Sequence, residues 1–317
     1  MPDPAAAIRD NASTSPRASD PAGLARLGTA FLVLVAATTG LIVLGALVRA
    51  HAAGLACPDW PLCFGEVIPQ LNLEVAFEWS HRAIAGGVSL SFAVLALLVF
   101  RRSDAPRGAR ALVGVAAALL ALQVLLGALT VWLLLASWTV TAHLITGNSL
   151  SLTLLLVACS LRDAAQPRPP RPPATAAVRG LVIASAVLLL VQMALGGLVS
   201  SNYAGMACPE WPTCNGGQWF PTWGGHVGLH LLHRSNGYAL VTVLAVSAAR
   251  CSGDAELRRW TSLALLLGVC EALVGISNVL LGIPVEITGL HSALAAALVL
   301  TLTRAVRDVT TRGAPRP

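Results

Sequence analysis

Apolar residues occur along this chain in long, nearly unbroken runs that are separated by shorter polar segments. Each run approaches the ~20 residues that a helix needs to cross a ~30 Å hydrocarbon core. None shows the period-two alternation of a membrane barrel strand. The pattern therefore predicts an all-α integral membrane protein. Eight transmembrane helices are expected at about residues 27–48, 78–100, 111–134, 138–161, 177–201, 228–249, 260–283 and 285–303.

The segment between the first two predicted helices is repeated later in the chain, at an offset of 151 residues. It reads Cys57-Pro58-Asp59-Trp60-Pro61-Leu62-Cys63 in the first copy and Cys208-Pro209-Glu210-Trp211-Pro212-Thr213-Cys214 in the second. Residues in the helices repeat in the same order, with His81-Arg82 returning as His233-Arg234, and His143 as His291. The repeat predicts two pseudo-symmetric four-helix bundles in tandem. Four helices per copy insert both copies the same way up, unlike the inverted repeats common in transporters.

Polar segments set the expected boundaries of these units. Residues 1–26 lack an apolar run and are expected to form a disordered cytoplasmic tail. The two four-helix halves are expected at 27–161 and 177–305, joined by a Pro/Arg-rich cytoplasmic linker at 162–176 that is stiff and polyproline-like. A second cytoplasmic tail is expected at 306–317.

The placement of charge predicts the orientation in the membrane. Only 11% of residues are charged, against about 25% in soluble domains. The net charge of +6 could suggest nucleic-acid binding, but 18 of the 21 basic residues, all arginines, fall in the two tails and in the connections after the second, fourth and sixth helices. Those five segments share one side of the membrane, and arginine-rich short loops stay cytoplasmic. We therefore expect a multi-pass inner (plasma) membrane protein with both termini inside, the cysteine loops outside, and no nucleic-acid partner.

Cysteine usage agrees with this orientation. Cys57 with Cys63, and Cys208 with Cys214, form pairs on the predicted outer side, where disulfides persist. We expect a disulfide in each loop. The remaining cysteines are single and lie in helices or near the inner edge.

Four histidines occupy matching depths near the outer ends of predicted helices. His81 and His143 lie on two parallel helices of the first half, and His233 and His291 on the equivalent helices of the second. Two imidazoles at one level inside a four-helix bundle are what a bis-histidine haem requires. Two alternatives remain at this point. The histidines could form interhelical hydrogen bonds in the core, or hold zinc or copper with Glu78 as a third ligand in the first half.

Charged residues beside these histidines differ between the halves. Arg82 and Arg234 directly follow a histidine and could pair with haem propionates, or extend to the membrane surface. Glu78 precedes His81 by one turn on the same face, and its counterpart is His230. Glu78 could be a catalytic carboxylate or only a helix cap. Glu271 replaces Gln123 near mid-membrane, where a carboxylate indicates function by default.

Taken together, the two four-helix halves, the four histidines, Glu78-x-x-His81 and the outer cysteine pairs resemble haem A synthase, over about residues 27–305. The resemblance implies oxidation of the haem O C8 methyl group to a formyl group, giving haem A for terminal oxidases. It also implies a catalytic first half with His81, His143 and Glu78, and a haem b in the second half held by His233 and His291. The four histidines would be the axial ligands of haem iron. Many members have cysteines in one outer loop or none, so no special catalytic role of Cys57 and Cys63 is implied.

The same resemblance implies haem O as substrate and haem A as product. Expected partners are the membrane haem O synthase (protohaem farnesyltransferase) and a quinol or other electron-transfer partner, with a homo-oligomer left open. Three other classes of protein are alternatives. A dihaem b-type electron-transfer protein has the same ligands, but two haems at one depth do not carry electrons across a membrane. A haem or lipid transporter is disfavoured by the parallel repeat, and disulfide exchange favours Cys-x-x-Cys over the spacing seen here.

Overall fold

The computed structural model describes residues 20–167, 169, 171–251 and 253–312. Expectations for residues 1–19 and 313–317 lie outside this range. The described residues form α-helices joined by loops, with one short 3-10 helix, η2 (Ala204–Met206). The α-helices are α1 (Pro21–Ala50), α2 (Leu73–Arg101), α3 (Arg107–Trp132), α4 (Ser137–Ala165), α5 (Ala176–Ser201), α6 (Gly225–Arg250), α7 (Ala255–Leu280) and α8 (Val285–Thr311).

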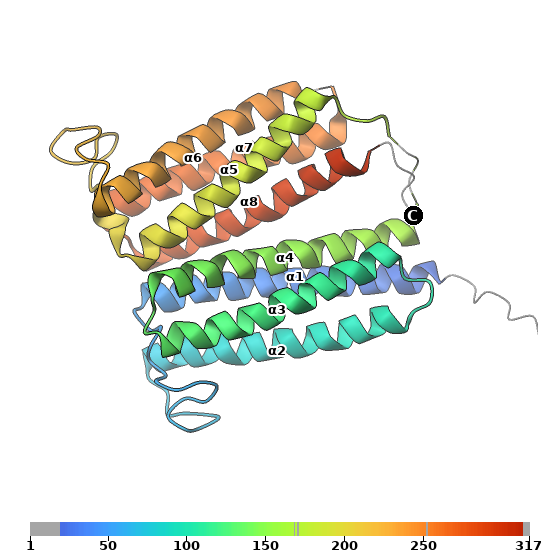
Figure 1. The fold of residues 1–317 in the computed structure, drawn as a ribbon, viewed down its shortest axis with the longest axis horizontal. Helices are drawn as coiled ribbons and strands as arrows, with labels where there is room; N and C mark the ends of the chain where they lie inside the picture. The colour runs from blue at the N-terminus through green and yellow to red at the C-terminus, as the bar shows by residue number, and fades with distance from the viewer. Residues whose placement is uncertain (1–19, 168, 170, 252, 313–317) are drawn as a thin grey trace, which may run out of the picture.

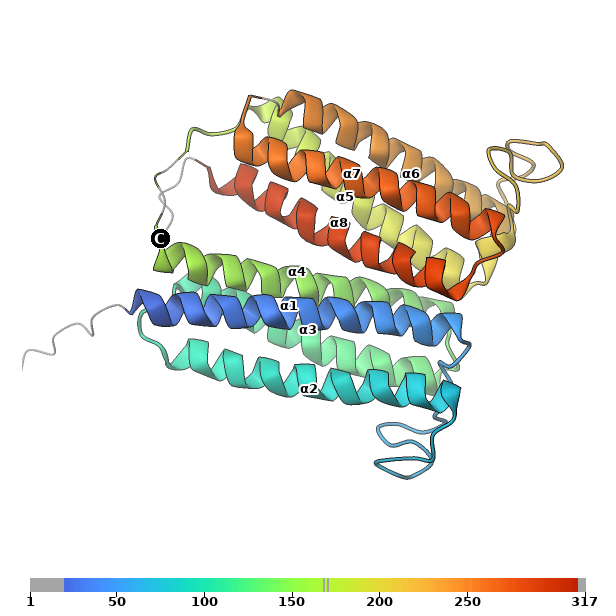
Figure 2. The same cartoon turned by 180° about the vertical axis from the view of Figure 1, so that it is seen from behind.

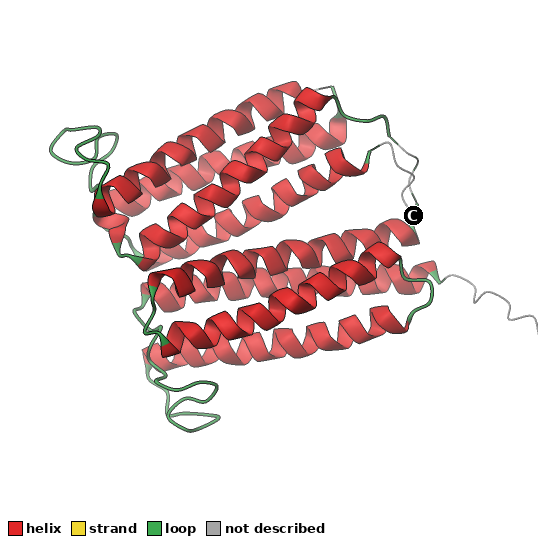
Figure 3. Ribbon diagram, in the orientation of Figure 1, coloured by secondary structure: helices red, strands yellow, loops and turns green. Residues whose placement is uncertain are grey.

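The helices form two bundles that lie side by side with their axes nearly parallel (Figures 1 and 2). The first bundle contains α1 to α4 and the second α5 to α8. Both long loops project from the same end of the molecule, at the left of Figures 1 and 3, and we call this the disulfide end. The start of α1 and the end of α8 lie at the opposite end. The predicted all-α, two-bundle architecture is confirmed.

Several helices begin earlier than their apolar runs predict. α2 begins at Leu73 rather than 78, because Asn72 Oδ1 accepts a hydrogen bond from the Val75 amide (2.8 Å) and caps the helix. Asp254 caps α7 in the same way through the Leu257 amide (2.9 Å). Side-chain caps satisfy the free amides of a first turn. Polar caps therefore extend a helix beyond the stretch that is apolar enough to cross a membrane.

The same effect moves the predicted domain boundaries. α1 begins at Pro21, within the segment 1–26 assigned to a tail, and α8 continues to Thr311, beyond 305. α4 likewise runs to Ala165, within the predicted linker. The described parts of these segments are helical extensions of the apolar runs, and the division of the chain into two functional units stays a prediction.

Two helices end earlier than expected because the turns that follow them are apolar. α3 ends at Trp132 and α7 at Leu280. In the first turn the Leu135 amide donates back to Thr130 O (2.8 Å), and in the second the Ile283 amide donates to Asn278 O (2.7 Å). Such bonds close helix C-termini. Leu135 and Ile283 have positive φ values of 60° and 61°, which hydropathy gives no means of predicting.

The distribution of apolar side chains is that of a membrane protein. Large apolar residues point outward along the helices, as at Val33 and Leu90, while hydroxyl pairs such as Ser185 with Ser247 (Oγ to Oγ, 3.3 Å) are buried between helices. Seven of the eight helices are long and apolar enough to cross a membrane. α6 falls short because its first half, residues 225–236, is rich in histidine, glycine and other polar residues. The chain is thus a multi-pass membrane protein.

The two bundles pack through α1 and α4 on one side and α5 and α8 on the other. Near the disulfide end, Arg49 of α1 donates to the Tyr203 hydroxyl (2.7 Å) and to Ser200 O (2.8 Å). At the opposite end, Arg307 of α8 pairs with Asp163 of α4 (2.6 Å). Contacts at both ends hold the halves in a fixed relation and place the two disulfide loops on one surface.

Candidate functional site

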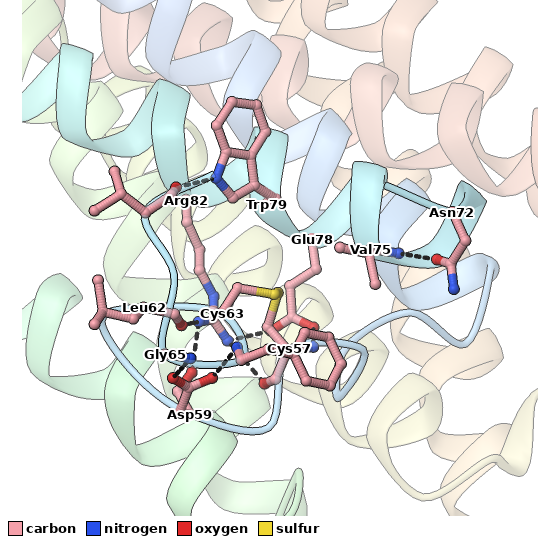
Figure 4. Close-up of a disulfide and its surroundings, with 12 residues drawn as sticks. Cys57, Asp59, Leu62, Cys63, Gly65, Asn72, Val75, Glu78, Trp79 and Arg82 are labelled. Carbon is pink, nitrogen blue, oxygen red and sulfur yellow. Dashed lines mark hydrogen bonds and ion pairs between the residues drawn. A yellow bond between two sulfur atoms is a disulfide. The ribbon is translucent and has the colours of Figure 1, made fainter. Parts of the chain in front are cut away.

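Each long loop at the disulfide end is closed by a disulfide, Cys57–Cys63 in the first half and Cys208–Cys214 in the second. Both predicted disulfides are confirmed. All four cysteines are buried, although the loops themselves project from the bundles. Figure 4 shows the first disulfide lying directly over the start of α2. The repeated motif therefore builds a compact cover at the end of each bundle where the histidines lie.

The acidic residue of the motif caps a turn in its own loop. Asp59 accepts hydrogen bonds from the Phe64 and Gly65 amides (2.7 and 2.8 Å). Glu210 accepts from the Gly216 and Gly217 amides (2.9 and 3.0 Å). The Gly65 amide, followed by that of Phe64, holds the pKa of Asp59 below its usual value of 3.8. The Gly217 amide does most to lower the pKa of Glu210. These carboxylates are structural members of the loops.

Acid is expected to release the first of these turns. Because the pKa of Asp59 is lower in the folded loop, its stabilising effect is complete above pH 3.8 and is lost as the pH falls through the lower folded value. The amide resonances of Phe64 and Gly65 should shift with a midpoint below pH 3.8 in a nuclear magnetic resonance titration. The Asp59→Asn variant should show no such titration at these amides. A midpoint at or above 3.8 in the wild type would contradict the capping role.

An arginine in the second helix of each half binds the loop above it. Arg82 donates through Nη1 to the carbonyl oxygens of Asp59 and Leu62 (2.6 and 2.7 Å) and through Nη2 to that of Cys57 (3.2 Å). Figure 4 shows the guanidinium inside the loop. Arg234 makes two of the equivalent contacts in the second half, to the carbonyl oxygens of Thr213 (3.1 Å) and Cys208 (2.6 Å). The structure thus gives both arginines a loop-binding role, while their pairing with propionates stays a prediction.

Glu78 adds a contact that only the first half has. Its Oε1 lies 2.5 Å from Arg82 Nη2, and its Oε2 accepts a hydrogen bond from the Cys57 amide (2.8 Å). The side chain is buried, with 4% of its surface exposed. At the equivalent position His230, equally buried, places Nδ1 3.1 Å from Ala204 O. A fixed anionic group therefore lies one turn before His81, and a neutral ring contact takes its place in the second half.

The histidine pair of the first half lies below this loop. His81 of α2 and His143 of α4 are close enough to interact electrostatically. His143 Nε2 lies 3.3 Å from Gln123 Nε2 of α3. An amide nitrogen only donates, and it can donate to His143 Nε2 when the proton of the neutral ring is on Nδ1. That tautomer leaves Nε2 with the lone pair that a metal ligand needs.

The second pair is surrounded by more polar groups. His233 of α6 and His291 of α8 also interact electrostatically. His233 Nε2 lies 3.4 Å from Gln192 Nε2 of α5. Asn236 orients that glutamine by donating to its Oε1 (2.8 Å). Glu271 Oε1 of α7 lies 3.2 Å from His291 Nδ1 without the alignment of a hydrogen bond.

Both pairs fit haem iron better than a bare metal ion. In all four histidines Nδ1 is buried without a hydrogen-bond partner within the described chain. Zinc or copper would need three or four ligands, and among the described residues no group of three or more His, Cys, Asp or Glu side chains could hold a metal ion. Glu78, the proposed third zinc ligand, is bound to Arg82 and the Cys57 amide instead. Two imidazoles are a complete protein ligand set for haem, whose porphyrin supplies the other four donors.

Sequence reasoning missed two polar residues of the second site, Gln192 and Asn236. Gln192 interrupts an otherwise apolar run in α5, the same signal that drew attention to Gln123. Their counterparts in the first half, Leu41 and Ile84, are apolar. The two sites therefore differ beyond the exchange of Glu78 for His230.

Fold and sites together define a class: duplicated multi-pass membrane proteins with a histidine pair and a loop cover in each half. The sequence profile of the cytochrome oxidase assembly protein family (COX15-CtaA) matches residues 29–303, and the chain belongs to this family. It is 31% identical to the heme A synthase of Shewanella oneidensis, over 88% of this chain and 93% of that protein. It is 30% identical to that of Halalkalibacterium halodurans, over 83% of this chain and 90% of that protein. A protoheme IX farnesyltransferase of Chloroflexus aurantiacus is 34% identical over 40% of this chain, which spans 22% of that protein.

Proposed function

We propose that this protein is a haem A synthase, which oxidises the C8 methyl group of haem O to a formyl group. The observation that carries the proposal is the division of labour between two equivalent sites. Both halves have a histidine pair under a disulfide loop, but only in the first does a buried carboxylate, Glu78, bind the loop and its arginine. The carboxylate of the second half, Glu271, lies instead beside His291. The names of the relatives support the same reaction for this chain.

In this proposal the second half binds a resident haem b and the first half binds the substrate. His233 and His291 would be the axial ligands of haem b, which supplies electron-transfer chemistry when bound. His81 and His143 would hold the iron of haem O. Arg82 and Arg234, which each bind a loop next to a ligand helix, would orient the propionates at the same surface. The catalytic unit is then residues 27–161, and the haem b unit is residues 177–305.

The negative charge of Glu78 would assist the oxidation of the methyl group. Removing hydrogen from a methyl group develops positive charge or releases protons, and a fixed carboxylate stabilises that charge or accepts a proton. The contacts with Arg82 and the Cys57 amide hold the carboxylate in place before substrate binds. Such pre-organisation is how an electrostatic group acts without reorganising during the reaction.

The proposal includes an orientation and partners. The arginine-rich connections lie at the end opposite the disulfide loops, which favours cytoplasmic termini and outward-facing loops. Oxidation of the methyl group needs an electron acceptor, which we propose to be a quinol/quinone couple or another redox partner. Haem O would come from a membrane protohaem farnesyltransferase. The likeness of part of this chain to a segment within one such enzyme supports that pairing.

Pigment analysis tests the proposed function directly. The protein should be expressed with and without a protohaem farnesyltransferase, purified, and its haems extracted and separated by chromatography. We expect haem b in both preparations, and haem O with haem A only when the farnesyltransferase is present. Haem b alone in both preparations would favour a dihaem electron-transfer protein and would contradict the proposal.

A further inference from the structure

Each of the four histidines faces a glycine on the helix that precedes it in the chain. A Cβ atom added at Gly45 of α1 would lie 3.1 Å from His81 Cε1, and one at Gly196 of α5 would lie 3.0 Å from His233 Cε1. The equivalent distance is 3.3 Å both from Gly127 of α3 to His143 Cε1 and from Gly275 of α7 to His291 Cε1. These separations are closer than Cβ atoms normally approach a ring carbon. A side chain at any of these positions would require the facing ring to move by a few tenths of an ångström.

Three of the rings lack the contact that usually fixes such a ligand, and at the fourth, His291, Glu271 Oε1 lies 3.2 Å from Nδ1 without hydrogen-bond alignment. A metal-bound histidine normally donates its second ring nitrogen to a carboxylate, carbonyl or water, which sets the plane of the ring. Here Nδ1 of all four histidines has no hydrogen-bond partner within the described chain. The ring planes must therefore be set by packing. Each ring packs on the side where its glycine leaves space that a Cβ atom would fill.

The repeat supports a shared role for these glycines. Gly45 and Gly196 are equivalent positions, at the 151-residue offset of the cysteine motif, as are Gly127 and Gly275, at the 148-residue offset of His143 and His291. A glycine in a helix interior is less favourable than alanine by roughly 0.5–1 kcal/mol. All four positions are inside helices, so local helix stability would favour alanine at each of them. A steric requirement explains why glycine stands there in both halves.

We propose that Gly45, Gly127, Gly196 and Gly275 are positioning residues that set the ring planes of the four haem-ligand histidines. This inference rests on the proposed haem ligation. A methyl group at any of them would rotate or displace the facing imidazole. The angle between two axial imidazole planes controls the electronic structure of low-spin ferric iron, so the change would be visible in spectra rather than only in activity. The chain needs these glycines for the haems, not for its helices.

Alanine variants with matched controls test the inference. In purified holoprotein we would measure the haem content, the largest g value in electron paramagnetic resonance and the midpoint potential of the low-spin haem. Gly196→Ala and Gly275→Ala should shift both spectroscopic quantities for the second site, and Gly45→Ala and Gly127→Ala should do so for the first. The shifts should be larger at Gly45 and Gly196, where the contacts are closer.

Glycines elsewhere on the same helices serve as controls. A Cβ atom at Gly40 of α1, Gly114 of α3 or Gly180 of α5 would meet nothing within 4 Å. Alanine there should leave haem content, g values and potential as in the wild type. Circular dichroism and the two loop disulfides report folding. If Gly196→Ala does not fold, the milder Gly275→Ala carries the test for the same haem.

The outcomes separate this inference from the function on which it rests. Wild-type g values and potentials in all four alanine variants would overturn the positioning role. If, in addition, His233→Ala and His291→Ala kept the low-spin spectrum, the ligand assignment itself would fail. Loss of that spectrum in the histidine variants, with unchanged glycine variants, would leave the proposed function standing and remove only the role of the glycines.

Discussion

Replacing His233 or His291 by alanine is expected to remove the low-spin haem b from the purified protein, because each would take away one of two axial ligands. Replacing His81 or His143 should instead abolish haem A while haem b remains. The asymmetry follows from the two sites: Glu78 lies beside the first pair, whereas Gln192 and Asn236 surround the second. Optical spectra and extracted haems of the four variants measure both effects.

His226 provides a matched control for these variants. It lies in the first turn of α6 and is exposed, so His226→Ala should keep wild-type spectra and product. Equal loss of all pigment from all four site variants, with an intact control, would contradict separate roles for the two halves. The circular dichroism spectrum of each variant distinguishes loss of haem from loss of fold.

Glu78→Gln is expected to fold, to retain haem b and to bind haem O, but to form haem A about 10²–10⁴-fold more slowly, the range typical of a lost acid–base group. The amide has the shape of the carboxylate and keeps an oxygen that can accept from the Cys57 amide. It lacks the charge that faces Arg82. Haem A formation over time in membranes supplied with haem O measures the effect, and a hydroxylated intermediate is expected to accumulate.

His230→Gln is the control from the equivalent position. His230 is as buried as Glu78 and contacts the backbone of its own half through Ala204 O. The variant should make haem A at the wild-type rate. Haem A formation at the wild-type rate in Glu78→Gln would mean that the carboxylate only anchors the disulfide loop. Mass spectrometry of the unreduced protein should find both disulfides intact, which excludes a disordered loop as the cause of lost activity.

The sequence was sufficient for the architecture because membrane helices leave long apolar runs and because the motif around Cys57 recurs around Cys208. Helix count, the two bundles and both disulfides followed from those two signals. Helix limits did not, since capping by Asn72 and Asp254 and the turns at Leu135 and Ile283 depend on backbone geometry. Composition does not report where a chain reverses when the turn itself is apolar.

The candidate site could be located but not built from the sequence. Histidines at equal depth predicted two sites, and the members of each pair interact electrostatically. The partners of Arg82 could not be predicted, because three of them are backbone carbonyls of a loop whose path depends on its disulfide. The glycine facing each histidine was also hidden. Gly45 and Gly196 were visible as repeated residues, but only packing shows that each one touches a ring.

The contact between Arg49 and Ser200 shows that equivalent positions of the two halves can carry different residues when both halves belong to one chain. These two residues occupy equivalent positions, 151 residues apart, yet they meet across the boundary between the bundles (2.8 Å). In a symmetric dimer of identical subunits, a residue at such a position would face its own copy. Two arginines would then confront each other with like charges. Fusion lets one of two equivalent positions carry the cation, Arg49, while the other carries a neutral side chain, Ser200, and the repulsion is avoided.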